Sequence, residues 1–320
     1  MPDDTSLLSG STARLLATFR ANNIICEVED AELNIIRYKT VNQEWRLLKG
    51  MVSEKLPVFS KQACDDKWWS YRLFLKFNLP TPDTIKYTSV KHSKDFIAKY
   101  KPIVIKPRRG AHGHGVSMNV TSVKELASPV SSAKKVNTHV LLQEQIQGTD
   151  IRLLVLGNQI VSALERRPAK IVGDGEHTVY ELIQLENKKP ERGKLGIDTL
   201  VAISLQSVRQ FLNKEQLSFI PKSGESVRVV GPSNQSIGGT VHDITDKIPA
   251  SMRQDTLRLT EHLQMPIAGV DCIMTHGNYY FLEINASPGI AIHDDLDSGI
   301  QSGCFTSYMH LLYQDSWWRT

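Results

Sequence analysis

The stretch Pro266–Gly289 has the composition of two apolar strands joined by a tight turn. Ile267–Met274 and Tyr279–Ile284 are rich in β-branched, aromatic and aliphatic residues, as the strands of a packed sheet are. His276-Gly277-Asn278 between them is typical of a hairpin turn. We therefore expect a β-hairpin here, with the rest of the chain organised around it.

Three polar side chains interrupt this apolar hairpin, namely Asp271, Glu283 and Asn285. A carboxylate inside an apolar strand is costly unless it is paired or binds a metal. Glu283 and Asn285 are two residues apart, so on a strand their side chains face the same way. Three hard oxygen ligands on one face suit Mg²⁺. A buried, ion-paired carboxylate with no metal is the alternative interpretation of the same residues.

A shared metal site constrains the register of the hairpin. With a two-residue loop at His276-Gly277, Asp271 would pair with Leu282 and point away from Glu283, because adjacent side chains face opposite ways. A three-residue loop, or an equivalent β-bulge, sets Asp271 opposite Glu283. We predict that register.

Composition and charge exclude several classes of protein. The 320 residues allow one large domain or two to three modest ones, and 41% hydrophobic with 22% charged residues is an ordinary globular balance. A net charge of +4 is too small to indicate nucleic acid or a membrane surface as the partner. No CxxC pair occurs, so neither a zinc knuckle nor a disulfide framework is predicted. The N-terminus is acidic and polar, unlike a signal peptide, and no apolar run is long enough to span a bilayer, so we expect a cytoplasmic protein.

The first 60 residues contain short mixed segments that predict a small α/β unit. We expect a helix over Thr12–Asn22, strands over Ile24–Val28 and Leu33–Tyr38, and then a further short segment over Trp45–Met51. This region carries no recognisable motif.

A second helix is expected from the cap Asp65-Asp66 to about Asn78. Its predicted buried stripe recurs every four residues, at Trp69, Leu73 and Phe77. Lys67 lies in the first turn, where the helix dipole disfavours a cation unless an anion binds beside it. A solvated lysine, offset by the two preceding aspartates, is the alternative.

A glycine-rich loop joins two predicted strands, Ile103–Lys106 and Val116–Val120. It differs from a Walker loop and from a dinucleotide fingerprint, because both of those lead from a strand into a helix. Its glycines allow backbone N–H groups to close over phosphate oxygens, and Lys106 supplies a positive charge beside them. The HxH pair His112 and His114 is more typical of a solvated loop than of a metal site.

Three further strands are expected in the middle of the chain. Val140–Gln145 carries Glu144 near its end, at a position suited to a nucleotide base, and Ile151–Leu156 pairs with Gln159–Leu164 about a Gly157-Asn158 turn. Arg152 lies at the start of the second of these strands.

The order of these parts resembles the ATP-grasp superfamily: VIKP, a glycine-rich hairpin, QE followed by GTDIR, then GVD and EINASPG. The segments 163–193, 224–246 and 268–293 are similar to the ATP-grasp module of cyanophycin synthetase and of fused glutathione-forming enzymes. The resemblance covers roughly residues 60–295. It implies an α+β ATP-grasp fold, with a small N-terminal α/β domain (1–85), a central subdomain carrying a glycine-rich lid (86–165) and a C-terminal subdomain (166–320). The nucleotide is expected between the last two.

Carried over residue by residue, the resemblance implies sites for ATP, metal and substrate. The residues implied to bind ATP are Lys67, Lys106, Gly110, His112, Gly113, His114, Gly115, Glu144, Gln145, Ile146, Asp150 and Arg152. Asp271, Glu283 and Asn285 are implied to hold two Mg²⁺ ions, with Mn²⁺ as the other candidate metal. The residues implied on the carboxylate side are Arg166, Arg228, Asn234, Ser236, Gly238, Gly239 and His293.

The sequence departs from the family pattern in two ways. An arginine close to the NQSIGG run is replaced by Val230, and Arg228, two residues earlier on the same strand face, is a candidate substitute. Cyanophycin synthetase also carries an additional N-terminal region and a Mur-ligase-like half, so both of its amide-forming activities are not expected of this chain alone.

The resemblance predicts an ATP-dependent ligase that joins a carboxylate to an amine, both of them amino acids or short peptides. A carboxylate–thiol ligase and a non-catalytic ATP-binding module that regulates a partner synthetase are the alternatives. A homodimer and a partner biosynthetic enzyme are the candidate assemblies. The resemblance also implies an insertion, formed by the Gly173-Asp174-Gly175 turn and a helix and loop over Glu176–Gly193. Its charged stretch Lys188–Arg192 is expected to be a solvated face, with an anionic substrate tail as the alternative ligand.

Overall fold

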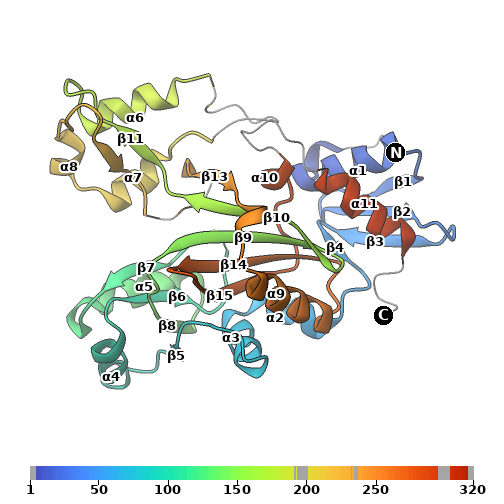
Figure 1. Ribbon diagram of the computed structural model, residues 1–320, viewed down its shortest axis with the longest axis horizontal. Helices are drawn as coiled ribbons and strands as arrows, with labels where there is room; N and C mark the ends of the chain where they lie inside the picture. The colour runs from blue at the N-terminus through green and yellow to red at the C-terminus, as the bar shows by residue number, and fades with distance from the viewer. Residues whose placement is uncertain are drawn as a thin grey trace.

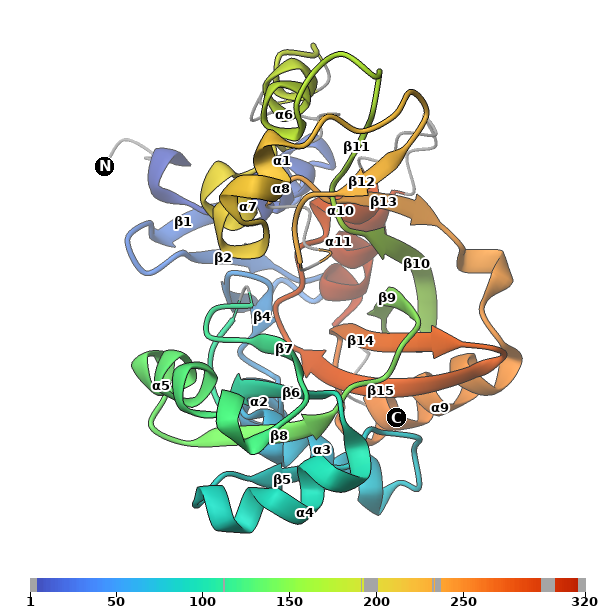
Figure 2. The ribbon, with the colours of Figure 1, turned by 90° about the vertical axis from the view of Figure 1, so that its left-hand side faces the viewer.

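The computed structural model describes residues 5–111, 113–190, 192, 201–231, 233, 237–294 and 303–315. Within these ranges the strands form a four-stranded sheet near the N-terminus, a second four-stranded sheet, a central five-stranded sheet and a two-stranded ribbon (Figure 1). The strand pairs in these ranges are all antiparallel, with helices packed against the sheets. Figure 2 shows the second four-stranded sheet below the central sheet, and the two-stranded ribbon above it.

The N-terminal unit packs two helices from opposite ends of the chain on one small sheet. Its elements are η1 (Thr5–Leu7), α1 (Gly10–Ala21), β1 (Cys26–Asp30), β2 (Ile35–Lys39), β3 (Trp45–Lys49), β4 (Val52–Ser53) and, from the far end, α11 (Cys304–Gln314). Phe19 of α1 stacks on Tyr38 of β2, with ring centroids 4.7 Å apart. The Tyr308 hydroxyl of α11 donates to the Met51 carbonyl at 2.7 Å. The predicted helix and strands are confirmed, with ends shifted by a few residues.

Two helices lead from this unit to the central sheet, namely α2 (Val58–Asp65) and α3 (Lys67–Lys76). Asp66 caps α3 as predicted, accepting from the backbone N–H of Trp68 and Trp69. The predicted buried stripe is wrong at Trp69, which is 42% exposed. The buried face is instead Ser70, Leu73 and Phe74, because α3 packs on the central sheet through a ring contact between Phe74 and Phe281.

The second four-stranded sheet has the order β5-β8-β6-β7. Its strands are β5 (Thr84–Lys86), β6 (Ile103–Pro107), β7 (Ser117–Val120) and β8 (Val140–Glu144), and its helices are α4 (Val90–Tyr100), η2 (Val123–Glu125) and α5 (Ala127–Val136). Apolar residues of β6 and β8 pack against α4 and α5 in one core. The predicted hairpin β6–β7 is present, and it holds the glycine-rich loop at its end.

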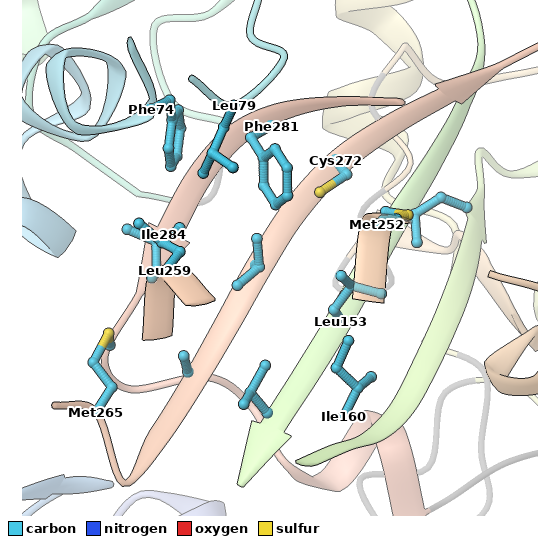
Figure 3. Close-up of a cluster of buried hydrophobic side chains, with 14 of the residues drawn as sticks. Phe74, Leu79, Leu153, Ile160, Met252, Leu259, Met265, Cys272, Phe281 and Ile284 are labelled. Carbon is cyan, nitrogen blue, oxygen red and sulfur yellow. The ribbon is translucent and has the colours of Figure 1, made fainter. Parts of the chain in front are cut away.

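The central sheet has the order β13-β10-β9-β14-β15. Its strands are β9 (Thr149–Leu156), β10 (Gln159–Arg167), β13 (Thr240–Asp243), β14 (Ile267–Thr275) and β15 (Asn278–Asn285). One face packs on α3, η4 (Thr245–Lys247) and α9 (Ala250–His262), and Figure 3 shows the resulting core around Leu153, Cys272 and Phe281. At one end of the other face, Leu154 and Ile267 join the core of the N-terminal unit.

The predicted insertion is part of a larger module after β10, which has its own apolar core. The module contains β11 (Lys170–Val172), α6 (Val179–Asn187), α7 (Leu205–Phe211), α8 (Lys214–Ser218) and β12 (Ser226–Arg228), and α10 (Ala291–Asp294) lies further along the chain, after β15. Val230, the position at which the resemblance implies an arginine, is fully buried in the core of this module. An arginine there would bury a charge among apolar side chains.

The predicted domain boundaries at 85/86 and 165/166 stay predictions, and each falls within a strand, β5 and β10 respectively. Within the described residues, the helices are all too short or too polar to cross a bilayer.

Candidate functional site

The predicted register of the β14–β15 hairpin is confirmed, and a bulge produces it. His276 and Gly277 form a two-residue turn with φ of 45° and 84°, and Thr275 pairs with Asn278. The register then shifts between Asp271 and Cys272, which adds one residue to β15, so Asp271 lies opposite Glu283. The predicted equivalent bulge thus takes the place of a three-residue loop.

The bulge has a physical cause in the apolar pattern of β15. Phe281 and Ile284 are both fully buried in the central core, although side chains three residues apart on a regular strand face opposite ways. One extra residue between them resolves the conflict. Leu282, Glu283 and Asn285 are only partly buried, as expected for side chains on the other face.

Neighbouring strands bring further charges to that face. Asp271 pairs in register with Arg152 of β9, and Asp150 of β9 pairs with Arg166 of β10. One guanidinium nitrogen of Arg152 donates to both carboxylate oxygens of Asp271 at 2.8 Å. Arg166 lies between two acids, 2.6 Å from Asp150 and 2.9 Å from Asp271. The amide nitrogen of Asn285 donates to Asp271 at 3.2 Å.

This network shifts the titration of its members. Burial disfavours the charged form of Asp271, yet the Arg152 and Arg166 guanidinium groups hold the pKa of its carboxyl below the ordinary value. Burial raises the pKa of Asp150, which Arg166 only partly offsets. Burial disfavours the charged form of Arg166 too, but Asp271 and Asp150 raise its pKa. Asp271 and Arg166 are therefore charged at neutral pH.

Gly269 makes room for the Arg152 guanidinium. A Cβ at Gly269 would lie 2.6 Å from Arg152 Nη2 and 2.8 Å from Pro288 Cβ, closer than real contacts allow. This tight fit holds Arg152 against Asp271.

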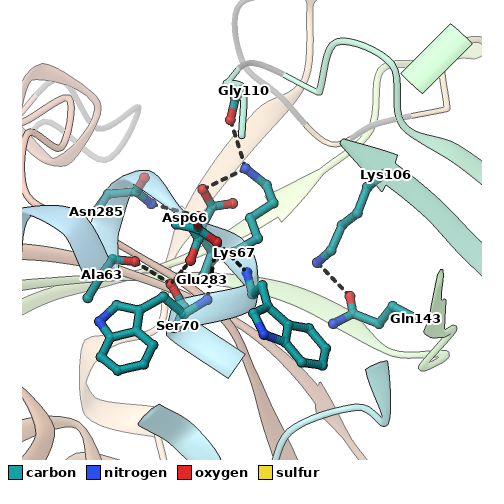
Figure 4. A network of polar contacts seen from close by, with 12 residues as sticks. Ala63, Asp66, Lys67, Ser70, Lys106, Gly110, Gln143, Glu283 and Asn285 are labelled. Carbon is teal, nitrogen blue, oxygen red and sulfur yellow. Dashed lines mark hydrogen bonds and ion pairs between the residues drawn. The ribbon is translucent and has the colours of Figure 1, made fainter. Parts of the chain in front are cut away.

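Two lysines reach the site from other elements (Figure 4). Lys67 Nζ donates to Glu283 at 3.0 Å and to the Gly110 carbonyl at 2.7 Å, so it is not the solvated lysine of the alternative interpretation. Lys106 Nζ donates to Gln143 at 2.7 Å. Burial, with the like charge of Lys67, lowers the pKa of Lys106 to about 8.

The glycine-rich loop has the backbone that its glycines allow. Gly110, Gly113 and Gly115 have φ of 140°, 73° and 72°, values that other residues rarely adopt. A Cβ at Gly115 would lie 3.1 Å from the backbone of Ala133 in α5. His114 is exposed, and His112 lies outside the described residues.

The residues predicted for the base lie at the end of β8 and directly after it. The Glu144 carboxylate accepts from the backbone N–H of Asp83 at 3.2 Å. Gln145 and Asn119 are joined by hydrogen bonds of 2.7 and 2.8 Å, which link β8 to β7. Ile146 is half-buried. These contacts leave the predicted nucleotide roles as predictions.

The residues predicted for the carboxylate side do not all converge. Arg228 donates to the Val230 and Gly231 carbonyls and lies over the Phe211 ring, beside a cavity of about 700 Å³ in the inserted module. The imidazole of His293 is buried, with Nδ1 2.8 Å from the Ser162 hydroxyl. Asn234 and Ser236 lie outside the described residues.

Gly238 and Gly239 are buried beside the inserted module. A Cβ at Gly238 would lie 2.7 Å from the Ile203 backbone. Arg192, expected on a solvated face, is 7% exposed and donates to the carbonyl of Gly238 at 3.2 Å and to Glu186 at 2.8 Å. The expectation fails at Arg192 because one of its partners, Gly238, lies 46 residues further along the chain, whereas Lys188–Pro190 are exposed as expected.

Sequence reasoning also missed the full role of Asp66. Its carboxylate binds Arg108 at 2.8 Å and Arg109 at 3.3 Å, in addition to capping α3. The capping signal was visible in the sequence, but the contact across some 40 residues was not.

The metal ligands implied by the family fit Mg²⁺ in their chemistry. Within the described part of the chain, no three His, Cys, Asp or Glu side chains gather as metal ligands. Asp271, Glu283 and Asn285 instead offer two carboxylates and an amide, whose oxygens are hard ligands. The carboxylates of Asp271 and Glu283 are paired with Arg152, Arg166 and Lys67, so a bound metal would compete with these three cations.

Comparison with known protein families gives a match over more than half of the chain. The family described as the RimK-like ATP-grasp domain matches residues 64–177 and 231–302. These ranges contain the lysines, arginines and acids of the site.

Individual relatives are longer than this chain. Glutathione biosynthesis bifunctional protein GshAB of Clostridium perfringens is 34% identical over 68% of this chain and 30% of that protein. Cyanophycin synthetase of Nostoc sp. is 27% identical over 83% of this chain and 31% of that protein. The chain thus spans about a third of the length of the curated relatives it matches.

Among solved structures, a bifunctional glutathione synthetase from Pasteurella multocida superposes with a TM-score of 0.67 at 24% identity. The match covers 96% of this chain and 43% of that one. It concerns the fold, and it confirms the α+β ATP-grasp architecture predicted from the sequence.

Proposed function

We propose that this chain, which belongs to the RimK-like ATP-grasp family, is an ATP-dependent ligase that joins a carboxylate to an amine through an acyl phosphate. The products would be an amide or peptide bond, ADP and inorganic phosphate. An amino acid or a short peptide is the proposed acid, and an amino acid the proposed amine. The activities of the longer relatives motivate this proposal.

The observation that carries the proposal is the set of charges on one face of the central sheet. Lys67, Lys106, Arg152 and Arg166 face the acids Asp150, Asp271 and Glu283 there, which leaves one positive charge in excess. ATP bound together with Mg²⁺ carries both negative and positive charge, and such a ligand suits a site that contains both acids and cations.

We infer roles for several of these groups from the chemistry of the reaction. A carboxylate is a poor acceptor because its leaving group would be oxide, whereas an acyl phosphate loses phosphate readily. Lys67 and Lys106 would hold the phosphates, and Arg166 would hold and orient the carboxylate substrate, for which a planar guanidinium is suited. Mg²⁺ held by Asp271, Glu283 and Asn285 would supply charge neutralisation between phosphate oxygens.

An acyl phosphate hydrolyses, so water has to be excluded while the amine attacks. The glycine-rich loop is the candidate lid, because its stem is already held by Lys67 next to Glu283.

The free thiols at Cys26, Cys64, Cys272 and Cys304 fit a reducing, ATP-containing compartment, so we propose a cytoplasmic location.

An isotope experiment tests the proposed step. With ¹⁸O in the carboxylate of the acid substrate, we expect label in the inorganic phosphate and ADP as the nucleotide product. Amino acids and dipeptides would be screened as acid and amine, with ADP release as the signal and Glu283→Gln as the inactive control. AMP and pyrophosphate, or unlabelled phosphate, would contradict the acyl phosphate.

The same screen distinguishes the alternatives. ADP release with thiols and not with amines would indicate a carboxylate–thiol ligase. ATP binding without turnover on any acid would indicate a non-catalytic module.

A further inference from the structure

We propose that Asp66 is a positioning residue, which holds Lys67 and the stem of the glycine-rich loop in a fixed arrangement. The proposal rests on the proposed function, since it concerns the elements assigned to the phosphates. Under this proposal Asp66 both caps α3 and holds the loop stem, and the second task is not part of an ordinary helix cap.

The Asp66 carboxylate is shared between two elements. The residue is 3% exposed, and its Oδ1 accepts from the backbone N–H of Trp68 at 3.1 Å and of Trp69 at 3.3 Å, which caps α3. The same carboxylate accepts from Arg108 Nε, 2.8 Å from both oxygens, and from Arg109 Nε at 3.3 Å. An N-cap needs no arginine partner, so these two contacts serve the loop.

Lys67 continues the contact along the loop stem. Its backbone N–H donates to the Arg108 carbonyl at 3.0 Å, and its ammonium donates to the Gly110 carbonyl at 2.7 Å. Residues 108, 109 and 110 are therefore each held by residue 66 or 67. Because Lys67 also binds Glu283, the loop stem is aligned with the face that carries Asp271 and Glu283.

Asp65 provides a matched comparison in the adjacent position. Its side chain is 52% exposed and pairs with Lys61, one turn earlier in α2. Both residues are aspartates with a cationic partner, but Asp66 reaches the loop and Asp65 pairs within its own helix.

Asp66→Asn separates the two tasks of this residue. Asparagine caps helices about as well as aspartate, so α3 should keep its first turn. It carries no charge for Arg108 and Arg109, so the stem should loosen. Asp65→Asn removes one neighbouring charge and is the control.

Hydrogen–deuterium exchange of the free chain is the first measurement. In Asp66→Asn we expect backbone amides of residues 109–115 to exchange at least about tenfold faster, while amides of residues 70–76 stay protected. In Asp65→Asn we expect neither change. Unchanged exchange in 109–115 would overturn the proposal, and so would equal loss of protection in α3 and the loop, because Asp66 would then be a structural cap alone.

Nucleotide binding is the second measurement. We expect the Kd for ATP with Mg²⁺ to rise about 10-fold in Asp66→Asn, the change that corresponds to losing one charge-assisted hydrogen bond. If faster exchange in the loop left this Kd unchanged, the positioning role would be refuted. If the wild-type chain bound no ATP, the proposed function would fail, and exchange in the free chain would still decide whether Asp66 anchors the loop.

Discussion

Lys106 should couple nucleotide binding to proton uptake. Its side chain is buried against Gln143, and burial together with the like charge of Lys67 lowers its pKa to about 8. Phosphate oxygens beside the ammonium would favour its charged form and raise that pKa. The bound state then holds more protons than the free state, so binding takes up protons and weakens as the pH rises.

The size of the effect follows from the free-state pKa. With a pKa of about 8, the free lysine is deprotonated in about one molecule in ten at pH 7, about half at pH 8 and about nine in ten at pH 9. Uptake per ATP should follow those fractions if the bound lysine stays charged. Above pH 8, the Kd should rise by a factor approaching tenfold for each pH unit.

Calorimetry measures this uptake directly. ATP with Mg²⁺ would be titrated at pH 7, 8 and 9 in two buffers with different ionisation enthalpies. Lys106→Met should abolish the uptake that grows with pH, whereas Lys99→Met, at a 69% exposed side chain, should leave it unchanged. Uptake that stays flat from pH 7 to 9, or persists in Lys106→Met, would refute the reasoning.

Four other outcomes follow from the structure. Glu283→Gln should lower kcat/KM by about 2–4 kcal/mol, roughly 30- to 1,000-fold, with little change in the free energy of unfolding, and wild-type turnover would remove Glu283 from the metal site. Gly269→Ala should displace Arg152 and lower activity, whereas Gly10→Ala, with open space around its Cβ position, should not; equal rates would show that Arg152 adapts. Phe281→Ala should cost about 3–5 kcal/mol in chemical denaturation, and a loss below about 1 kcal/mol would mean that the core collapses around it. Exchange at residues 109–115 should slow when ATP and Mg²⁺ bind, and identical rates with and without nucleotide would contradict a lid.

The strands of the site were predictable because each carries a local signal. Apolar runs and turn residues marked β9, β10, β14 and β15, and the chemical demand for Asp271 opposite Glu283 predicted their register. The bulge itself is visible only in the burial pattern of the structure, where the alternation of buried side chains changes phase between Phe281 and Ile284. A register argument from chemistry and one from burial therefore agree.

The contacts that were missed depend on tertiary partners. Trp69 follows the helical period of α3, yet the packing of that helix against Phe281 buries Phe74 instead. Arg192 stands in a charged run that is typical of a surface, and one of its partners, the Gly238 carbonyl, comes from a distant segment. Nothing local distinguishes Asp66 from Asp65. Long-range partners decide all of these positions.

The ion pair between Lys67 and Glu283 makes the free site electrically balanced at that point. A divalent cation taken up alone by Glu283 would leave the Lys67 ammonium beside it without a counter-ion. A triphosphate bound alone by Lys67 would face the released Glu283 carboxylate. If both came together, Lys67 would exchange the carboxylate for phosphate and Glu283 would exchange the ammonium for the metal, so neither charge would be left uncompensated. A site built in this way would favour the metal–nucleotide complex over either ion by itself.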